Sequence, residues 1–226
     1  RQFNPEVGVF PNSFFSLPPL LPNRIIGNGI RLFFGAINRE KDWAPLIEDL
    51  NAELRLNPGF WSFSVVHDRK FYDSLDLPPS RKSFTPACSY DRYLAEIAKC
   101  DVAFLPLQDT PFNQMKSNLK AIESAAHGLA ILASDVMYKR SLVNGMTAQL
   151  FSDSAELRWH LKIWRAEPDR VRRLGNQARI WVERECMAAS QVSRIDDWYR
   201  DLVSRREELT QALFKRMPEL AARAPD

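Results

Sequence analysis

The sequence predicts an α/β fold: a Rossmann-like parallel sheet of about six strands flanked by helices, with a helical carboxyl-terminal extension. Short, continuously apolar runs alternate with stretches whose apolar residues recur at helical spacing. Continuous apolar runs are typical of parallel strands that are buried on both faces, and the helices between them form right-handed crossovers. From residue 152 the pattern becomes amphipathic helices without intervening strands.

The expected elements follow from these patterns in chain order. Strands are expected at 30–35, 60–68, 82–85, 101–107, 129–134 and 147–151. Asp42 is expected to cap a helix over 43–56, since a carboxylate before an apolar periodic run is a common helix start. The later helices are expected at 91–99, in the stretch before Gly128, and at 152–165, 169–185 and 190–214, with Asp153 or Ser154, Pro168 and Ser190 as their caps.

Three regions are expected along the chain. Residues 1–29 are rich in proline and asparagine and are expected to be an interdomain connector with one short strand at 6–10. Residues 30–185 are expected to form the Rossmann-like domain, and 186–226 its helical extension. Because the chain opens on arginine, we expect it to be part of a longer protein.

The composition bounds the class of protein. The 226 residues are 45% hydrophobic, so they can bury a full core, and a net charge of +3 does not indicate a nucleic-acid partner. Cys88, Cys100 and Cys186 form no CxxC pair, which favours reduced thiols in a cytoplasmic setting over a disulfide framework or a zinc site. No apolar stretch approaches the roughly 20 residues that span a bilayer, and no signal peptide is recognisable.

The loop DTPFNQMKSN after the strand at 101–107 is the first candidate site. Ligands of such sheets bind beyond the carboxyl ends of the strands. The start of the next helix is surrounded by four polar residues, Asn113, Lys116, Ser117 and Asn118. Unpaired backbone N–H groups at a helix start favour an anion.

Two further strand ends carry polar residues. Asn38, Arg39 and Lys41 follow the strand at 30–35, although basic residues in surface loops are most often simply solvated. His67 at the end of another strand is either a catalytic base or a histidine satisfied at the sheet edge. His127, next to Gly128, is expected to cap a helix end.

These motifs together resemble a known family. Their order along the chain is GAINREKDW, a Phe-Thr-Pro turn before two tyrosines, CDVAFLPL, TPFNQMKSNLKAIESAAHG, ILAS and MYKRSLVNGMTAQLF. This order resembles that of the carboxyl-terminal domain of GT-B glycosyltransferases. The sequence is most similar to the retaining group called group 1 or family 4, over about residues 6–185.

The resemblance implies a donor site for a nucleotide-diphospho-sugar. Glu123 matches the family carboxylate that binds the ribose hydroxyls, and such a carboxylate can accept from two vicinal hydroxyls at once. Lys41 matches the lysine that contacts the diphosphate, and Lys116 resembles a second diphosphate ligand. Fixed positive charge stabilises the leaving nucleoside diphosphate as the glycosidic bond breaks.

The sequence also departs from the family pattern. A family glutamate eight residues before Glu123 is replaced by Met115, and the arginine after the first glycine by Ala36. Contacts to the sugar are therefore expected from Asp109, Thr110, Asn113 or backbone amides, with Asn38 or Arg39 substituting for the arginine.

By this resemblance we expect a hexosyltransferase that retains the anomeric configuration and needs neither a metal nor an organic cofactor. The acceptor, a glycan or a lipid-linked molecule, would be held by a missing amino-terminal domain, so the fragment alone is expected to bind the donor and turn over little. A cytoplasmic place is expected, with association at the inner membrane face as a variant. Two alternatives stay open: a GT-B-like sugar-nucleotide epimerase, and a non-catalytic Rossmann-like interaction module.

Overall fold

The computed structural model describes residues 5–20 and 29–221. The chain divides into two compact units, residues 12–187 and a smaller unit formed by residues 1–11 together with 188–226. Residues 21–28, which belong to the expected connector, lie outside the described residues. No helix of the described segments is both long and apolar enough to cross a membrane.

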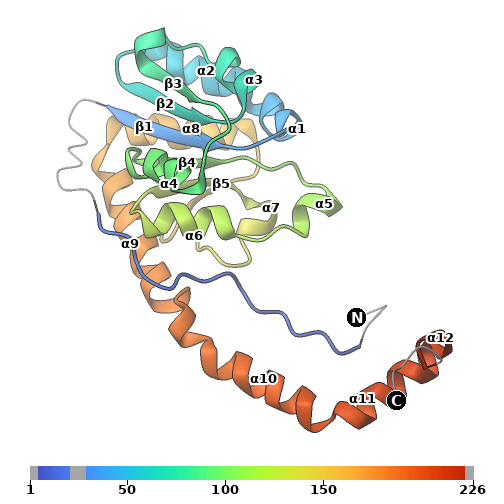
Figure 1. The fold of residues 1–226 in the computed structure, drawn as a ribbon. Helices are drawn as coiled ribbons and strands as arrows, with labels where there is room; N and C mark the ends of the chain where they lie inside the picture. Colours follow the sequence, from blue (N-terminus) through green and yellow to red (C-terminus); the bar gives the residue numbers. More distant parts are fainter. Residues whose placement is uncertain (1–4, 21–28, 222–226) are drawn as a thin grey trace. The chain divides into compact units, whose positions relative to one another are not determined.

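The larger unit contains a six-stranded sheet in which each described strand pairs in parallel with its neighbours, in the order β3-β2-β1-β4-β5-β6 (Figure 1). The predicted fold class is thereby confirmed. The strands lie close to the expected ranges: β1 Ile30–Gly35, β2 Trp61–Val66, β3 Lys82–Thr85, β4 Val102–Leu105, β5 Ala130–Ser134 and β6 Gln149–Phe151.

The order of the strands reverses between β1 and β4. The chain first builds outward from β1 through β2 to β3, and then returns to the other side of β1 to place β4, with Leu32 beside Val102. In open parallel sheets, such a reversal opens a crevice at the carboxyl ends of the two strands, because their following loops diverge. Here those carboxyl ends are Gly35 and Leu105.

Helices cover both faces of the sheet (Figure 1). One core joins the sheet to α2 (Ile47–Leu56), α3 (Arg69–Ser74) and α8 (Ser154–Ala166). The other joins it to α4 (Tyr90–Ala98), α6 (Leu119–Ala126) and α7 (Asp135–Tyr138). The long helix α9 (Asp169–Glu185) contributes its first turns to one core and its last turns to the other.

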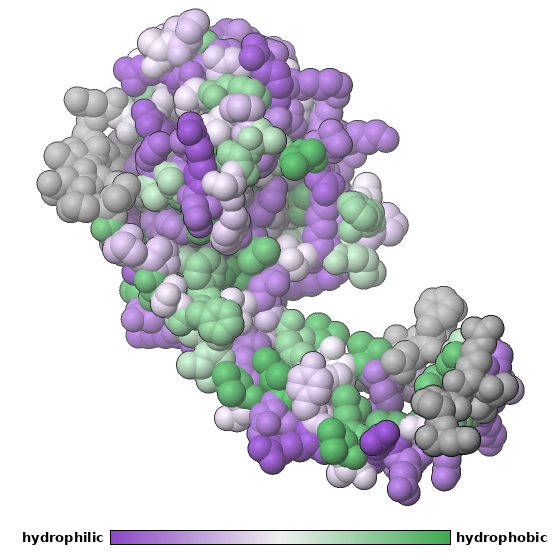
Figure 2. Space-filling model, in the orientation of Figure 1, coloured by the Kyte–Doolittle hydropathy of each residue, from purple (hydrophilic) through white to green (hydrophobic). Residues whose placement is uncertain are grey.

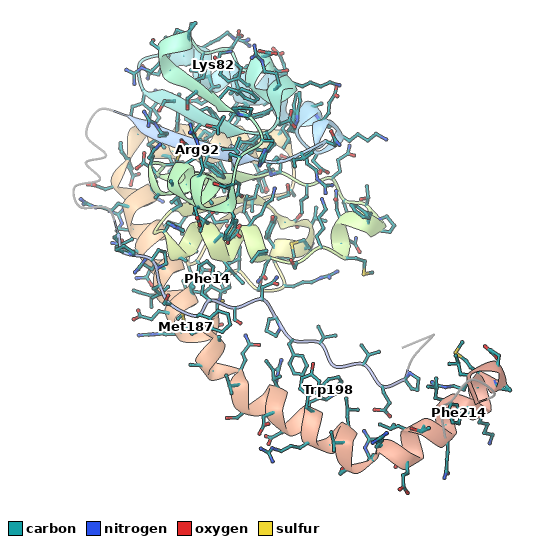
Figure 3. The ribbon with its side chains drawn as sticks, viewed as in Figure 1. Phe14, Lys82, Arg92, Met187, Trp198 and Phe214 are labelled. Atoms are coloured by element: carbon teal, nitrogen blue, oxygen red, sulfur yellow. The ribbon has the colours of Figure 1, made fainter. Side chains whose placement is uncertain are left out.

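Helix α9 passes very close to β5. A Cβ atom on Gly175 would collide with the carbonyl oxygen of Gly128, just before the strand. Only a glycine therefore allows this approach of two backbones. At the far end of α9, Phe14 N donates to Cys186 O over 2.8 Å, and Phe14 and Met187 form an isolated bridge (Figure 3).

Several expected boundaries are wrong. Asp42 does not cap a helix: it lies inside the short helix α1 (Glu40–Trp43), which a 3-10 turn separates from α2. The expected helix over 190–214 is two helices, α10 (Val192–Ser204) and α11 (Arg206–Arg216), and Gln191 rather than Ser190 precedes the first. Residues 6–10 form no strand. Asp153 caps α8 as expected, accepting from Glu156 N.

The smaller unit pairs the first described residues with α10. Trp198, labelled in Figure 3, meets Phe10 edge to face with ring centroids 5.5 Å apart. Arg205 lies 3.1 Å from Glu6. Hydrophobic residues also lie on the outside of this unit (Figure 2), where Val192 and Val203 are exposed. The chain continues through α11 to α12 (Pro218–Ala221).

Candidate functional site

A cavity of about 310 Å³ lies at the carboxyl ends of β1 and β4, where the strand order reverses. Its floor is apolar and its polar lining is mainly cationic. The loop after β4 and the start of α6 supply most of the remaining wall. The lining residues are Phe34, Gly35, Ala36, Arg39, Phe104, Leu105, Pro106, Leu107, Phe112, Lys116, Ser117, Leu119, Lys120 and Tyr138.

Three cations line this cavity: Arg39, Lys116 and Lys120. Arg39 and Lys116 both lie over the ring of Phe112, 5.7 Å and 5.4 Å from its centroid. Lys120 Nζ donates to the carbonyl oxygen of Gly35, at the end of β1. The cations therefore come from two separate loops and one helix, and they converge where a ligand of this sheet would bind.

The pKa values of Lys116 and Lys120 are both lowered in this cavity. Burial, together with the charges of Arg39 and Lys116, lowers the pKa of Lys120 to about 8, although Glu123 and Asp42 act in the opposite direction. Burial and Arg39 also lower the pKa of Lys116, while nearby Asp42 opposes the shift. An anion entering the cavity would relieve this repulsion, because opposite charge favours the protonated amine.

Asp42 connects residues from two loops around the cavity. Its side chain is 6% exposed and lies 3.7 Å from Arg39 and 3.8 Å from Lys116. One carboxylate oxygen also accepts from Gln108 N over 3.0 Å and from Asn113 Nδ2 over 2.7 Å. A single buried carboxylate thus fixes the loop after β1 to the loop after β4, and sets the places of two cations.

Glu123 lies on α6, next to the cavity but not on its wall. It is 4% exposed, and Tyr90 donates its phenol proton to Oε1 over 2.7 Å. Burial raises the pKa of Glu123, although the Tyr90 hydrogen bond and the charge of Lys120 act in the opposite direction. At the end of the same helix, His127 is the C-cap residue and its Nδ1 bonds to Glu123 O, as expected of it.

A second cavity of about 640 Å³ adjoins the first and shares Arg39 and Phe112 with it. It lies over the carboxyl ends of β1, β2 and β4, and its wall includes His67, whose backbone has φ +73°. Of the predicted site residues, its wall contains Asn38, Arg39, Lys41, Thr110 and Asn113.

Most of the predicted residues are thus divided between two adjoining cavities, whereas Glu123, Asp109 and Asn118 line neither of them. Lys116 and Ser117 line the first, and the exposed Lys41 lines the second. Two predicted sugar contacts are engaged within the protein: Thr110 Oγ1 accepts from Asn113 N, and Asn113 Nδ2 binds Asp42 and Gln108 O.

Sequence reasoning missed Lys120 and Tyr90, and it gave Asp42 the wrong role. A signal for Lys120 was present, since Lys116, Lys120 and Glu123 stand at positions i, i+4 and i+7, which share one helical face. For Asp42 the sequence offered only its place before an apolar helix pattern, because its partners come from a loop more than 60 residues later.

Solved structures share this fold. Sucrose-phosphate synthase from Thermosynechococcus elongatus is 22% identical, with a TM-score of 0.61 over 79% of this chain and 46% of that one. HepE from Anabaena, in complex with UDP-glucose, is 14% identical, with a TM-score of 0.61 over 78% of this chain and 50% of that one. This chain therefore spans about half the length of these two relatives.

A shorter relative matches over most of its own length. The C-terminal domain of a glycosyl transferase group 1 family protein, LpcC from Francisella tularensis, is 15% identical, with a TM-score of 0.55 over 70% of this chain and 86% of that one. No curated protein sequence matches this chain.

The fold is that of the carboxyl-terminal domain of GT-B, group 1 glycosyltransferases, as the sequence motifs indicated. A family model described as "Glycosyl transferase-like" matches residues 39–197. Since this match covers more than half of the chain, the chain belongs to that glycosyl transferase-like family.

Proposed function

We propose that this chain is the donor-binding part of a glycosyltransferase, and that it holds a nucleotide-diphospho-sugar at the carboxyl ends of β1 and β4. The observation that carries the proposal is the convergence of Arg39, Lys116 and Lys120 on one cavity. Three cations set against the carboxylates of Asp42 and Glu123 leave an excess of positive charge for a diphosphate.

The leaving group gives this charge a catalytic use. As the bond between sugar and phosphate breaks, negative charge grows on the nucleoside diphosphate, and preorganised cations stabilise it in a partly buried site. The three cations supply positive charge that a divalent ion would otherwise bring, so we propose transfer without a metal. By family analogy we propose that transfer retains the anomeric configuration of a hexose.

The remaining predicted residues receive roles in this proposal. Glu123 accepts from the ribose hydroxyls, and Ser117 lies beside the diphosphate. Asn38, Lys41, Thr110 and Asn113, which line the second cavity, serve the sugar end of the donor. The two cavities adjoin through Arg39 and Phe112, so one extended ligand can occupy both.

The acceptor site belongs to a domain outside this chain in the proposal. The chain spans about half of two solved relatives, one of which has UDP-glucose bound according to its description. We therefore propose that this chain alone binds the donor and has little transferase activity, and that the acceptor is a glycan or a lipid-linked molecule. The proposal is for a protein of the cytoplasm or of the inner membrane face.

Calorimetric titration with UDP, GDP and ADP, with and without EDTA, tests the donor site. Binding of one of them, unchanged by EDTA, supports the proposal. Lys120→Ala should weaken the diphosphate far more than the matching nucleoside, because an amine contacts phosphate and not the base. Absence of binding of all three at millimolar concentration would refute the donor site and favour an interaction module.

A further inference from the structure

The ribose end of the proposed site is already occupied by a side chain of the protein. Tyr90 Oη lies 2.7 Å from Glu123 Oε1 and donates its proton there. Within residues 5–20 and 29–221, this phenol is the one group that donates a hydrogen bond to the Glu123 carboxylate. The hydrogen bond therefore occupies one of the acceptor sites of Oε1, and a vicinal diol would contact this oxygen together with Oε2.

The two partners of this hydrogen bond differ sharply in exposure. Glu123 is 4% exposed, whereas the side chain of Tyr90 is one of the large exposed apolar groups of the chain at 56%. Tyr90 is the first residue of α4, directly after its cap Ser89. An exposed ring at a helix start can rotate away at little cost in packing, while the carboxylate beneath it cannot leave the helix that carries it.

The ring of Tyr90 also ends a ladder of near-parallel rings. It stacks on Tyr93 with centroids 6.3 Å apart and an interplanar angle of 16°, and Tyr93 in turn stacks on His67. Tyr93 is fixed, because it meets Phe33 edge to face and a Cβ on Gly35 would collide with its ring. Tyr90 is thus the movable end of a fixed aromatic series.

We infer that Tyr90 is a lid on Glu123, and that a ribose must displace its phenol to reach the carboxylate. The residue then acts as a specificity determinant: a sugar with both the 2′- and 3′-hydroxyls replaces the lost hydrogen bond twice over, whereas a deoxyribose replaces it only once. This inference rests on the proposed function, because it assigns a partner to the nucleoside end of the same site.

The test compares Tyr90→Phe with the wild type in calorimetric titrations with UDP and 2′-deoxy-UDP, or with GDP and 2′-deoxy-GDP if UDP does not bind. The variant keeps the ring and loses only the hydroxyl. The empty site then loses a charge-assisted hydrogen bond that the occupied site lacks, so affinity for the ribonucleotide should rise about tenfold. Preference for the ribonucleotide over the deoxyribonucleotide should be clear in the wild type.

Tyr199→Phe is the matched control. Tyr199 is 58% exposed and lies in the smaller unit, so its hydroxyl should not influence nucleotide affinity. Glu123→Gln in the wild-type background should weaken the ribonucleotide and leave the deoxyribonucleotide much less affected.

The outcomes separate the two proposals. If the wild type binds no nucleotide, the donor site itself fails. If the wild type binds UDP but Tyr90→Phe has unchanged or weaker affinity, Tyr90 orients Glu123 or is irrelevant to it, and the lid is refuted. Equal affinity of the wild type for UDP and 2′-deoxy-UDP would contradict the discrimination of ribose.

Discussion

Binding of a nucleoside diphosphate should make the protein take up a proton at alkaline pH. In the empty cavity, burial and the charges of Arg39 and Lys116 lower the pKa of Lys120 to about 8. A diphosphate brings negative charge to this amine and raises its pKa again. Between the two pKa values, the free protein has lost the proton and the complex holds it, so binding must acquire one from the buffer.

The magnitude follows from the pKa of Lys120. At pH 9, about one unit above the pKa, about nine-tenths of the empty sites carry a neutral amine. Affinity for UDP should therefore fall by up to about tenfold per pH unit above pH 8, and binding at pH 9 should take up about 0.9 proton. The ligand itself adds no proton uptake here, because the second pKa of a phosphate is about 6.

Titrations in buffers with different ionisation enthalpies measure this proton. Lys120→Arg should remove most of the uptake, since a guanidinium stays charged throughout this range. A smaller part can remain, because the pKa of Lys116 is also lowered by burial. Lys41→Arg, at an exposed position, is the control and should leave the uptake unchanged. UDP binding at pH 9 without proton uptake, or undiminished uptake in Lys120→Arg, would refute the reasoning.

Three further predictions concern the framework of the site, each measured by urea unfolding followed through tryptophan fluorescence. Asp42→Ala removes the buried acceptor of one backbone donor, Gln108 N, and of one side-chain donor, Asn113 Nδ2. It should lower the free energy of unfolding by about 1–3 kcal/mol. Gly175→Ala forces a methyl group against a backbone carbonyl and should cost about 1–3 kcal/mol despite the better helix propensity of alanine. Arg165→Ala leaves the carboxylate of Glu53 buried without its cation, because this side chain is 1% exposed and 2.6 Å from the guanidinium. The free energy of unfolding should fall by about 3–5 kcal/mol.

The glycine substitution has a matched control, and each of the three predictions has a result that would contradict it. Gly59→Ala should be nearly neutral, because a Cβ there meets only a guanidinium nitrogen of Arg81 at 3.8 Å. Stability of Gly175→Ala equal to the wild type would mean that α9 does not approach β5 this closely. For Arg165→Ala, a loss below about 1 kcal/mol would indicate that water reaches Glu53. Asp42→Ala with intact stability and UDP affinity would remove Asp42 as the organiser of the cavity.

The sheet could be predicted because its signal is local. A run such as Ile30–Gly35 is apolar at nearly every position, and the structure buries nearly every position of β1. The strand at 82–85 and the helix at 169–185 were predicted to the residue, because a turn with adjacent prolines and an initial Pro168 mark their beginnings. Where no such mark exists, as at Arg205 between α10 and α11, one long helix was expected instead of two.

The candidate site was harder because its contacts join distant parts of the chain. Lys116 was found through its place in a loop after a strand. The role of Asp42 depends on partners at 108 and 113, and that of Tyr90 on a partner 33 residues away. No pattern within one helix or loop reports such pairs. Lys120 differs, since its helical spacing to Glu123 was visible in the sequence and only its burial was not.

The pairing of the first described residues with α10 has a consequence for any attempt to separate the two units. The polypeptide passes between them twice, near residue 11 and near residue 187. Within the larger unit, Phe14 donates to Cys186 O and forms an isolated bridge with Met187. A protease that cuts one passage therefore leaves the larger unit covalently linked to the smaller one through the other passage. Because Glu6 pairs with Arg205, 199 residues later, the smaller unit can form only after the ribosome has synthesised the whole of the larger unit.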